Sequence, residues 1–185
     1  CRYYIRYCNG WKWNAPGAKQ FYLRSDSGGA FSWGYETNVK PVSSGNLFGP
    51  GYPSIDVGAY HIQILGPNVG PPSNAYLYPG QWYCIEIALQ PNSPVATANG
   101  SGKLWVNNVL THDYTGLNWR NLAVNPNSNI NAVWCSAYVG GPTNPHPPLS
   151  LWWDQIVVAK NYIGPMVELA DAVSGKITTV RRLVR

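Results

Sequence analysis

Up to its C-terminal tail, the chain alternates between short aromatic or β-branched stretches and turns rich in Gly, Pro and Asn. Residues 80–106 show this pattern most clearly, with a segment at 82–89 and a second at 103–106 separated by a polar turn. Apolar runs bounded by turn-forming residues are typical of β-strands joined as a hairpin. We therefore expect the rest of the chain to be organised around strands rather than helices.

The same pattern recurs along the sequence, and nothing before the tail has helical periodicity or a repeat of fixed length. The pattern predicts further strands at 2–8, 19–24, 31–36, 59–65, 109–112, 130–139 and 149–159. It also predicts a long loop at 38–54 and a turn at 114–116. So many short strands with turns between them predict an all-β, double-sheet sandwich.

Composition supports one ordered domain. The 185 residues include 9 Trp and 13 Tyr but only 11% charged residues, which favours an all-β fold and argues against disorder. We assign 1–164 to the sandwich and 165–185 to a basic tail. Four of the 13 Lys and Arg residues lie in that tail, which is either a solvated end or an arm for self-association. The rest of the chain has nine Lys and Arg against six Asp and Glu, and we expect no nucleic acid partner.

The cysteines are Cys1, Cys8, Cys84 and Cys135, and no C-x-x-C pair suggests zinc. Three disulfide pairings remain open, as do buried free thiols. Because the chain opens directly in a strand, we expect residues upstream of it in the natural protein. No segment is long and apolar enough to span a membrane.

Several kinds of chemistry are absent. The eight acidic residues are scattered, without the E-x-D-x-x-E arrangement that would line one strand face with a glycosidase carboxylate pair. Phosphate-loop, zinc-protease and nucleophile-elbow motifs are also missing. We expect no cofactor, although Asp154 with a loop carbonyl could hold a structural calcium ion weakly.

The remaining polar residues fit β-elimination of a uronate polysaccharide. That reaction needs a cation or amide against the substrate carboxylate, and a base and an acid near C5 and the leaving oxygen. In the strand at 19–24, alternation puts Phe21 and Leu23 on one face and Gln20, Tyr22 and Arg24 on the other. The catalytic candidates are His61 and Gln63, which share a strand face, with Lys19, Tyr22, Arg24 and Arg6. The alternative is that they are ordinary solvated strand residues.

The tryptophans and tyrosines have two interpretations. Rings in loops either stack on sugar rings or cap the ends of the core. The candidates for substrate binding are Trp11, Trp13, Tyr52 and Trp119, with Tyr78 as a further loop aromatic. The strand residues Trp82, Trp105, Trp134 and Trp153 are expected to pack in the core or on a sheet face.

The run GQWYCIEIALQPNSPVATANGSGKLWVNNVLTHDYTGLNWR resembles polysaccharide lyases of the jelly-roll, concanavalin A-like fold. Alginate and glucuronan lyase-like families and proteins grouped with heparin lyase I are the most similar. The shared positions include Gly80, Trp82, Asn92, Trp105 and Asn107. The closing stretch WWDQIVVAKNYIG and the opening stretch YYIRYCNGWKWN are also similar. The triplet at 61–63 is similar to the Q-I-H triplet of alginate lyases in reversed order, and the strand at 2–6 lacks the Glu of their R-x-E-x-R strand.

The resemblance implies an extracellular or cell-surface protein that acts on an anionic polysaccharide. One hypothesis is a secreted lyase that cleaves a uronate polymer by β-elimination. A second is a non-catalytic glycan-binding module, and a third is a structural protein of a virion, filament or cell surface. The same scaffold serves all three, so fold alone does not choose among them.

Overall fold

The computed structural model describes residues 1–9, 18–27, 30–41, 53–60, 77–120, 129–139 and 150–166. These residues contain no helix and nine strands, which confirms the all-β prediction. The strands are β1 (Arg2–Tyr7), β2 (Ala18–Ser27), β3 (Ala30–Pro41), β4 (Pro53–Tyr60), β5 (Trp82–Gln90), β6 (Gly100–Val106), β7 (Val109–Leu117), β8 (Ala132–Val139) and β9 (Leu151–Val157).

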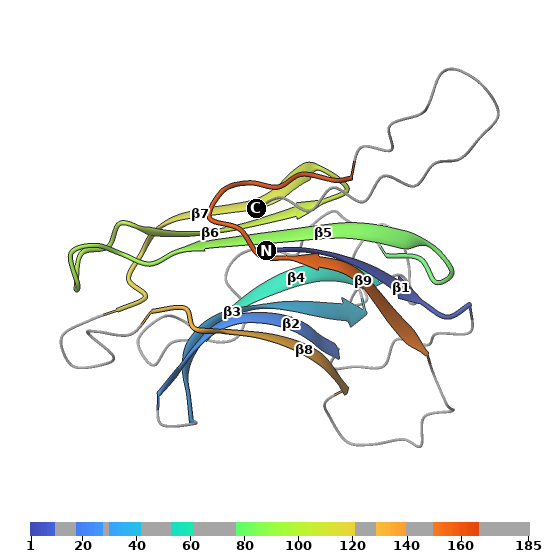
Figure 1. Cartoon of the computed structure of the whole chain (residues 1–185), viewed down its shortest axis with the longest axis horizontal. Helices are drawn as coiled ribbons and strands as arrows, with labels where there is room; N and C mark the ends of the chain where they lie inside the picture. Colours follow the sequence, from blue (N-terminus) through green and yellow to red (C-terminus); the bar gives the residue numbers. More distant parts are fainter. Residues whose placement is uncertain are drawn as a thin grey trace.

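The strands form two antiparallel sheets that stack on each other (Figure 1). The five-stranded sheet has the order β7-β6-β5-β1-β9 and the four-stranded sheet has the order β4-β3-β2-β8. In Figure 1, β2 and β3 arch beneath the five-stranded sheet, so the outer face of the four-stranded sheet lies on the inside of the bend. The predicted two-sheet antiparallel sandwich is confirmed.

The core lies between the sheets and is built from alternate residues of the central strands. Tyr3 and Phe21 stack across it with their ring centroids 4.3 Å apart. The hydroxyl of Tyr3 shares a hydrogen bond of 2.8 Å with Thr37, and burial raises the pKa of Tyr3. The other fully buried apolar side chains of β1, β5 and β6 are Ile5, Tyr7, Ile85, Ile87 and Leu104.

Gln20 corrects the simple alternation expected in β2. Its side chain is 1% exposed, and Tyr7 donates its hydroxyl hydrogen to Gln20 Oε1 at 2.6 Å. The register shifts between Lys19 and Phe21 against both β3 and β8. An extra residue in a strand turns the following side chains to the opposite face. The prediction that Gln20 shares a face with Tyr22 and Arg24 is therefore wrong.

Several strand boundaries also differ from prediction. The loop expected at 38–54 is strand at both ends, because β3 continues to Pro41 and β4 begins at Pro53. The strand predicted at 59–65 is β4 up to Tyr60, and 61–65 lie outside the described residues. The turn expected at 114–116 is absorbed into β7, where Gly116 takes a φ of 71° inside the strand.

The β6–β7 hairpin confirms the turn expected after 103–106. Asn107 and Asn108 have φ angles of 48° and 70°, the left-handed pair that a two-residue hairpin turn needs. Asn107 Oδ1 also accepts a hydrogen bond of 2.9 Å from the Cys84 backbone N–H. Asn107, one of the residues that resemble the lyase motif, therefore forms part of the hairpin turn and links it to β5.

Residues 158–166, here called the strap, return across the outer face of the five-stranded sheet (Figure 1). Glu86, which is 3% exposed, accepts hydrogen bonds from the backbone N–H groups of Ile163 and Gly164 at 2.8 and 2.9 Å. Arg2 donates to the Gly164 carbonyl at 3.0 Å. Each buried charged group on this part of the sheet thus contacts a polar partner from the strap.

The four cysteines are free thiols, with Cys1 and Cys84 buried and Cys135 exposed. Cys84 lies beside the strap, and burial raises its pKa. The structure therefore selects the free-thiol alternative over all three disulfide pairings.

Candidate functional site

Three side chains gather on the outer face of the four-stranded sheet, and we call them the β2–β8 cluster. Tyr22 of β2 pairs with Trp134 of β8, and their rings stack with centroids 5.2 Å apart at an interplanar angle of 25°. Arg24 lies over the same indole, with its Cζ 4.6 Å from the ring centroid. Tyr22 is 6% exposed whereas Trp134 is 49% exposed, so the indole forms the accessible surface of the cluster.

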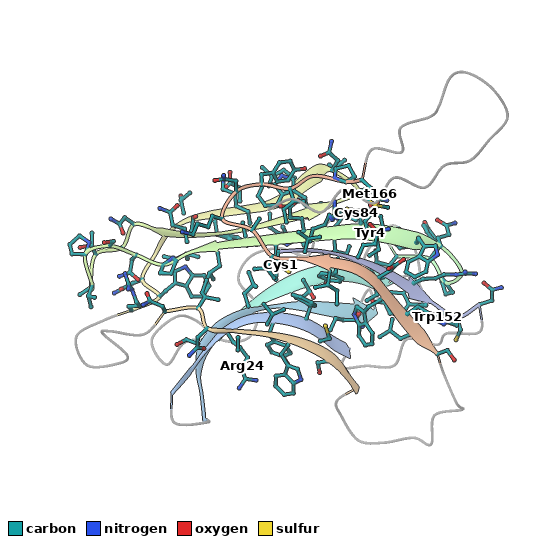
Figure 2. All side chains as sticks on the ribbon, in the orientation of Figure 1. Cys1, Tyr4, Arg24, Cys84, Trp152 and Met166 are labelled. Carbon is teal, nitrogen blue, oxygen red and sulfur yellow. The ribbon has the colours of Figure 1, made fainter. Side chains whose placement is uncertain are left out.

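The strand pattern of β2 puts these residues on one face. Phe21 and Leu23 belong to the core, so Tyr22 and Arg24 point away from it. Figure 2 shows Arg24 on the side of the four-stranded sheet that faces away from the five-stranded sheet. An aromatic cross-strand pair and a cation over a ring each stabilise such an arrangement and hold its orientation.

The register relates the cluster to other predicted residues. Tyr60, the last residue of β4, pairs with Gly34, and Gly34 pairs with Arg24. The described end of β4 therefore lies in the same row as Arg24. His61 is the next residue in the sequence. The Cα of Lys19 pairs with Asn38 on β3 and with Tyr138 on β8, three residues along β2 from Tyr22.

Several predicted site residues fall outside the described part of the chain. They are His61 and Gln63 among the catalytic candidates, and Trp11, Trp13 and Tyr52 among the aromatic ones. Lys19 is described through its backbone position only. Their roles stay predictions.

Arg6 does not lie with Tyr22 and Arg24. It belongs to β1 of the five-stranded sheet, and its neighbours Ile5 and Tyr7 face the core, so Arg6 points to the outer side of that sheet. Its Cζ lies 5.6 Å from the ring centroid of Trp152 on β9. The prediction that Arg6 joins the catalytic group fails because β1 and β2 belong to different layers of the sandwich.

Trp119 was expected to present its ring to a sugar, and the structure contradicts this. Its side chain is 0% exposed, and its indole N–H donates to the Ser101 carbonyl at 3.2 Å. A Cβ at Gly100 would lie 2.6 Å from Trp119 Cδ1, so the ring fills the space left by that glycine. Trp119 therefore closes one end of the core, which is the other interpretation of these aromatic residues.

Sequence reasoning missed two exposed tryptophans besides Trp134. Trp82 and Trp152 are each 44% exposed. Trp82 and Trp134 were expected in the core or packed on a sheet face, and the structure places both on outer sheet faces with close to half of each side chain exposed. The signal was available in the alternation of β5, where Tyr83 and Ile85 face the core and leave Trp82 on the opposite face.

Within the described part of the chain, no group of three or more His, Cys, Asp or Glu could hold a metal ion. Asp154, the residue suggested for calcium, accepts a hydrogen bond of 2.7 Å from the Gln155 backbone N–H. No described helix is long and apolar enough to cross a membrane.

Comparison with solved structures finds the same fold in alginate lyase Aly36B. The structure of that enzyme matches with a TM-score of 0.62 and 15% identity, over 83% of this chain and 65% of the other. A variant of it in complex with alginate trisaccharide matches with a TM-score of 0.64 and 16% identity, over 83% and 66% of the two chains. Another variant, in complex with alginate tetrasaccharide, gives a TM-score of 0.59 and 18% identity, over 83% and 65%.

These matches show a polysaccharide lyase-like fold. The chain spans about two thirds of the length of the Aly36B chains that it matches. No protein-family model matches the sequence, and no curated protein matches it.

Proposed function

We propose that this chain binds an anionic, uronate-containing polysaccharide on the outer face of its four-stranded sheet and cleaves it by β-elimination outside the cell. The observation that carries the proposal is the β2–β8 cluster, in which Arg24 and Tyr22 flank the exposed indole of Trp134. The cluster occurs on a fold shared with alginate lyase Aly36B, two variants of which bind alginate oligosaccharides.

The cluster offers each kind of contact that the substrate needs. The half-exposed indole of Trp134 leaves apolar surface that can contact the apolar face of a sugar ring. The guanidinium of Arg24 can pair with the uronate carboxylate through its fork of N–H donors. Pairing is strongest when the C5 proton has left, because the carboxylate then carries the charge of an enolate-like state.

In the proposed reaction, a base removes the C5 proton, the electrons form a C4–C5 double bond, and the bond to the C4 oxygen breaks. An acid then protonates the departing oxygen, so no water is consumed. Tyr22 is the described residue next to Arg24 that carries a transferable proton. Lys19, His61 and Gln63 stay the predicted sources of the second proton-transfer group and of a further donor to the carboxylate.

The proposal is tested by incubating the protein with alginate, glucuronan and heparin and following the ultraviolet absorbance of the unsaturated uronate product. We expect product from at least one polymer and about a hundredfold loss of rate for Arg24→Gln. Lys103→Gln is the matched control, since it removes one positive charge from an exposed pair with Asp113 on the other sheet. No product from any polymer, or equal rates for the two variants, contradicts the proposal.

A second candidate function is glycan binding without cleavage. The observation in its favour is the 6% exposure of Tyr22, whose ring is covered by Trp134, because an acid or base must reach its substrate. Binding to the polymers without any unsaturated product, weakened by Trp134→Ala, would establish this function instead.

A further inference from the structure

We propose a second saccharide-binding surface on the outer face of the five-stranded sheet, which takes a segment of an anionic polysaccharide. It consists of Trp82, Arg6 and Trp152, which we call the tryptophan row. Arg6 on β1 pairs directly with Trp82 on β5 and with Trp152 on β9, so the three residues form one line across three strands. Directly paired residues of antiparallel strands share a face, which here is the face away from the core.

The spacing of the row suits an oligosaccharide. Neighbouring strands lie about 4.8 Å apart, so the two tryptophan positions are separated by about 10 Å. A single sugar ring is shorter than that distance, whereas an extended chain that crosses the strands can contact both indoles. Each indole is 44% exposed, so each leaves a large flat area for such contacts.

The strap covers one aromatic residue of this outer face and leaves the tryptophan row exposed. Trp105 lies on the same outer face, opposite Glu86, and the strap residue Tyr162 packs on it with ring centroids 4.9 Å apart. The strap thus covers an aromatic residue in one part of the sheet, and the backbone N–H of Met166, its last described residue, donates to the hydroxyl of Tyr4. The row begins two residues further along β1, where both indoles stay open.

The polar groups of the surface favour an anionic sugar over a lipid or a purely apolar partner. The guanidinium of Arg6 lies against one indole, with its Cζ 5.6 Å from the Trp152 centroid. Its Nε is buried without a hydrogen-bond partner within the described part of the chain, so a carboxylate would pair with the other nitrogens of the half-buried guanidinium.

This surface lies on a different layer from the β2–β8 cluster, because β1, β5 and β9 belong to the five-stranded sheet and β2 and β8 to the four-stranded sheet. A polymer held on the tryptophan row keeps the protein close to its substrate without occupying the proposed cleavage site. Such tethering raises the local concentration of polymer at the second site. The proposal concerns binding and holds whether or not the other face cleaves.

The experiment is affinity electrophoresis of the full chain in gels that contain alginate, heparin or the neutral polymer dextran. The test variant is Trp82→Ala combined with Trp152→Ala, and Arg6→Gln tests the charge. Leu110→Ala on β7 is the matched apolar control, because its side chain is 45% exposed and lies in neither proposed surface. Lys103→Gln is the matched charge control. Far-ultraviolet circular dichroism of every variant separates loss of binding from loss of fold. A further variant, Trp82→Phe combined with Trp152→Phe, keeps an aromatic ring at both positions.

We expect retention of the unmodified chain by an anionic gel, and about a tenfold weaker apparent affinity for the double Ala variant. The double Phe variant should keep part of the retention, and Arg6→Gln should lose more than Lys103→Gln. Unchanged retention of a folded double Ala variant overturns the proposal, as does a chain that no anionic gel retains. Equal retention by dextran overturns the anionic class of ligand. Retention in the gel does not depend on formation of unsaturated product, so the test decides the binding proposal even if the protein does not cleave the polymer.

Discussion

The outer faces of the two sheets each place an arginine against a tryptophan, yet their surroundings differ. On the four-stranded sheet, Arg24 lies over Trp134, with Tyr22 buried beneath the same ring. On the five-stranded sheet, Arg6 lies between two half-exposed indoles, and its Cζ is 5.6 Å from the ring centroid of Trp152. The first arrangement is compact and has a group able to exchange a proton beside the cation, whereas the second is a flat, extended surface.

The difference shows how one fold can carry the proposed cleavage site and the proposed polymer-binding surface on separate sheets. Proton transfer needs several groups held within hydrogen-bond reach of one sugar, which a compact cluster supplies. Attachment of a polymer needs flat area over a longer distance, which a row across three strands supplies. The strap then determines how much of the five-stranded face stays available.

The largest expected effect separates a tryptophan of the core from a tryptophan on an outer face. Trp119→Ala should lower the free energy of unfolding by about 3–5 kcal/mol, because its fully buried indole leaves a cavity. Trp152→Ala should cost less than about 1 kcal/mol, because that ring is half exposed. Urea unfolding of the two variants measures the difference, and equal losses would show that Trp152 also supports the core.

The next effect separates the two arginines. Arg24→Gln should lower kcat on short uronate oligosaccharides by about a hundredfold, because its contact with the substrate carboxylate strengthens in the transition state. Arg6→Gln should act chiefly on KM for long polymer, since it lies on the other sheet. Steady-state kinetics on short and long substrates compares them. The comparison breaks down if Arg6→Gln lowers kcat as much as Arg24→Gln does.

A smaller effect tests the covered part of the five-stranded face. Glu86→Ala should destabilise the fold by about 2 kcal/mol, because the N–H groups of Ile163 and Gly164 lose a buried charged acceptor. Asp113→Ala is the matched control, and its exposed ion pair with Lys103 should contribute less than about 1 kcal/mol. Chemical unfolding gives both values. A similar loss for both variants would mean that Glu86 does not hold the strap.

The smallest effect is on thiol reactivity. Burial raises the pKa of both Cys84 and Cys135, so both should alkylate slowly at neutral pH and faster as the pH rises through the ordinary thiol value of 9.0. Cys84, buried beside the strap, should react about tenfold more slowly than the exposed Cys135. Mass spectrometry of alkylated peptides gives both rates. Glu86→Ala should speed up Cys84 alone, and a Cys84 that already reacts as fast as Cys135 would show an open strap.

Much of the architecture could be predicted from local sequence. The strand segments of β1, β5 and β8, and the Asn107-Asn108 turn, follow from short-range backbone preferences. The bulge that turns Gln20 inward could not be predicted, because it depends on the register of β2 against two neighbours. The continuation of β3 and β4 into the predicted loop has the same cause, since those residues pair with each other.

The candidate site divides in the same way. Tyr22 and Arg24 could be found, because two residues two positions apart on one strand share a face whatever the rest of the chain does. Trp134 was missed as their partner because a cross-strand pair is formed only when distant segments meet. Arg6 was grouped with them wrongly because sequence proximity does not say which sheet a strand joins.

The sequence by itself determined the strands, the β6–β7 turn and the residue types that suit an anionic sugar. Those features depend on backbone preference and side-chain chemistry, which are local. Only the tertiary structure decided that Arg24 and Arg6 lie on opposite layers, that Trp119 is core, and that the strap covers Trp105 but not Trp82. These depend on pairing between segments far apart in the chain, where burial and register are set by the fold as a whole.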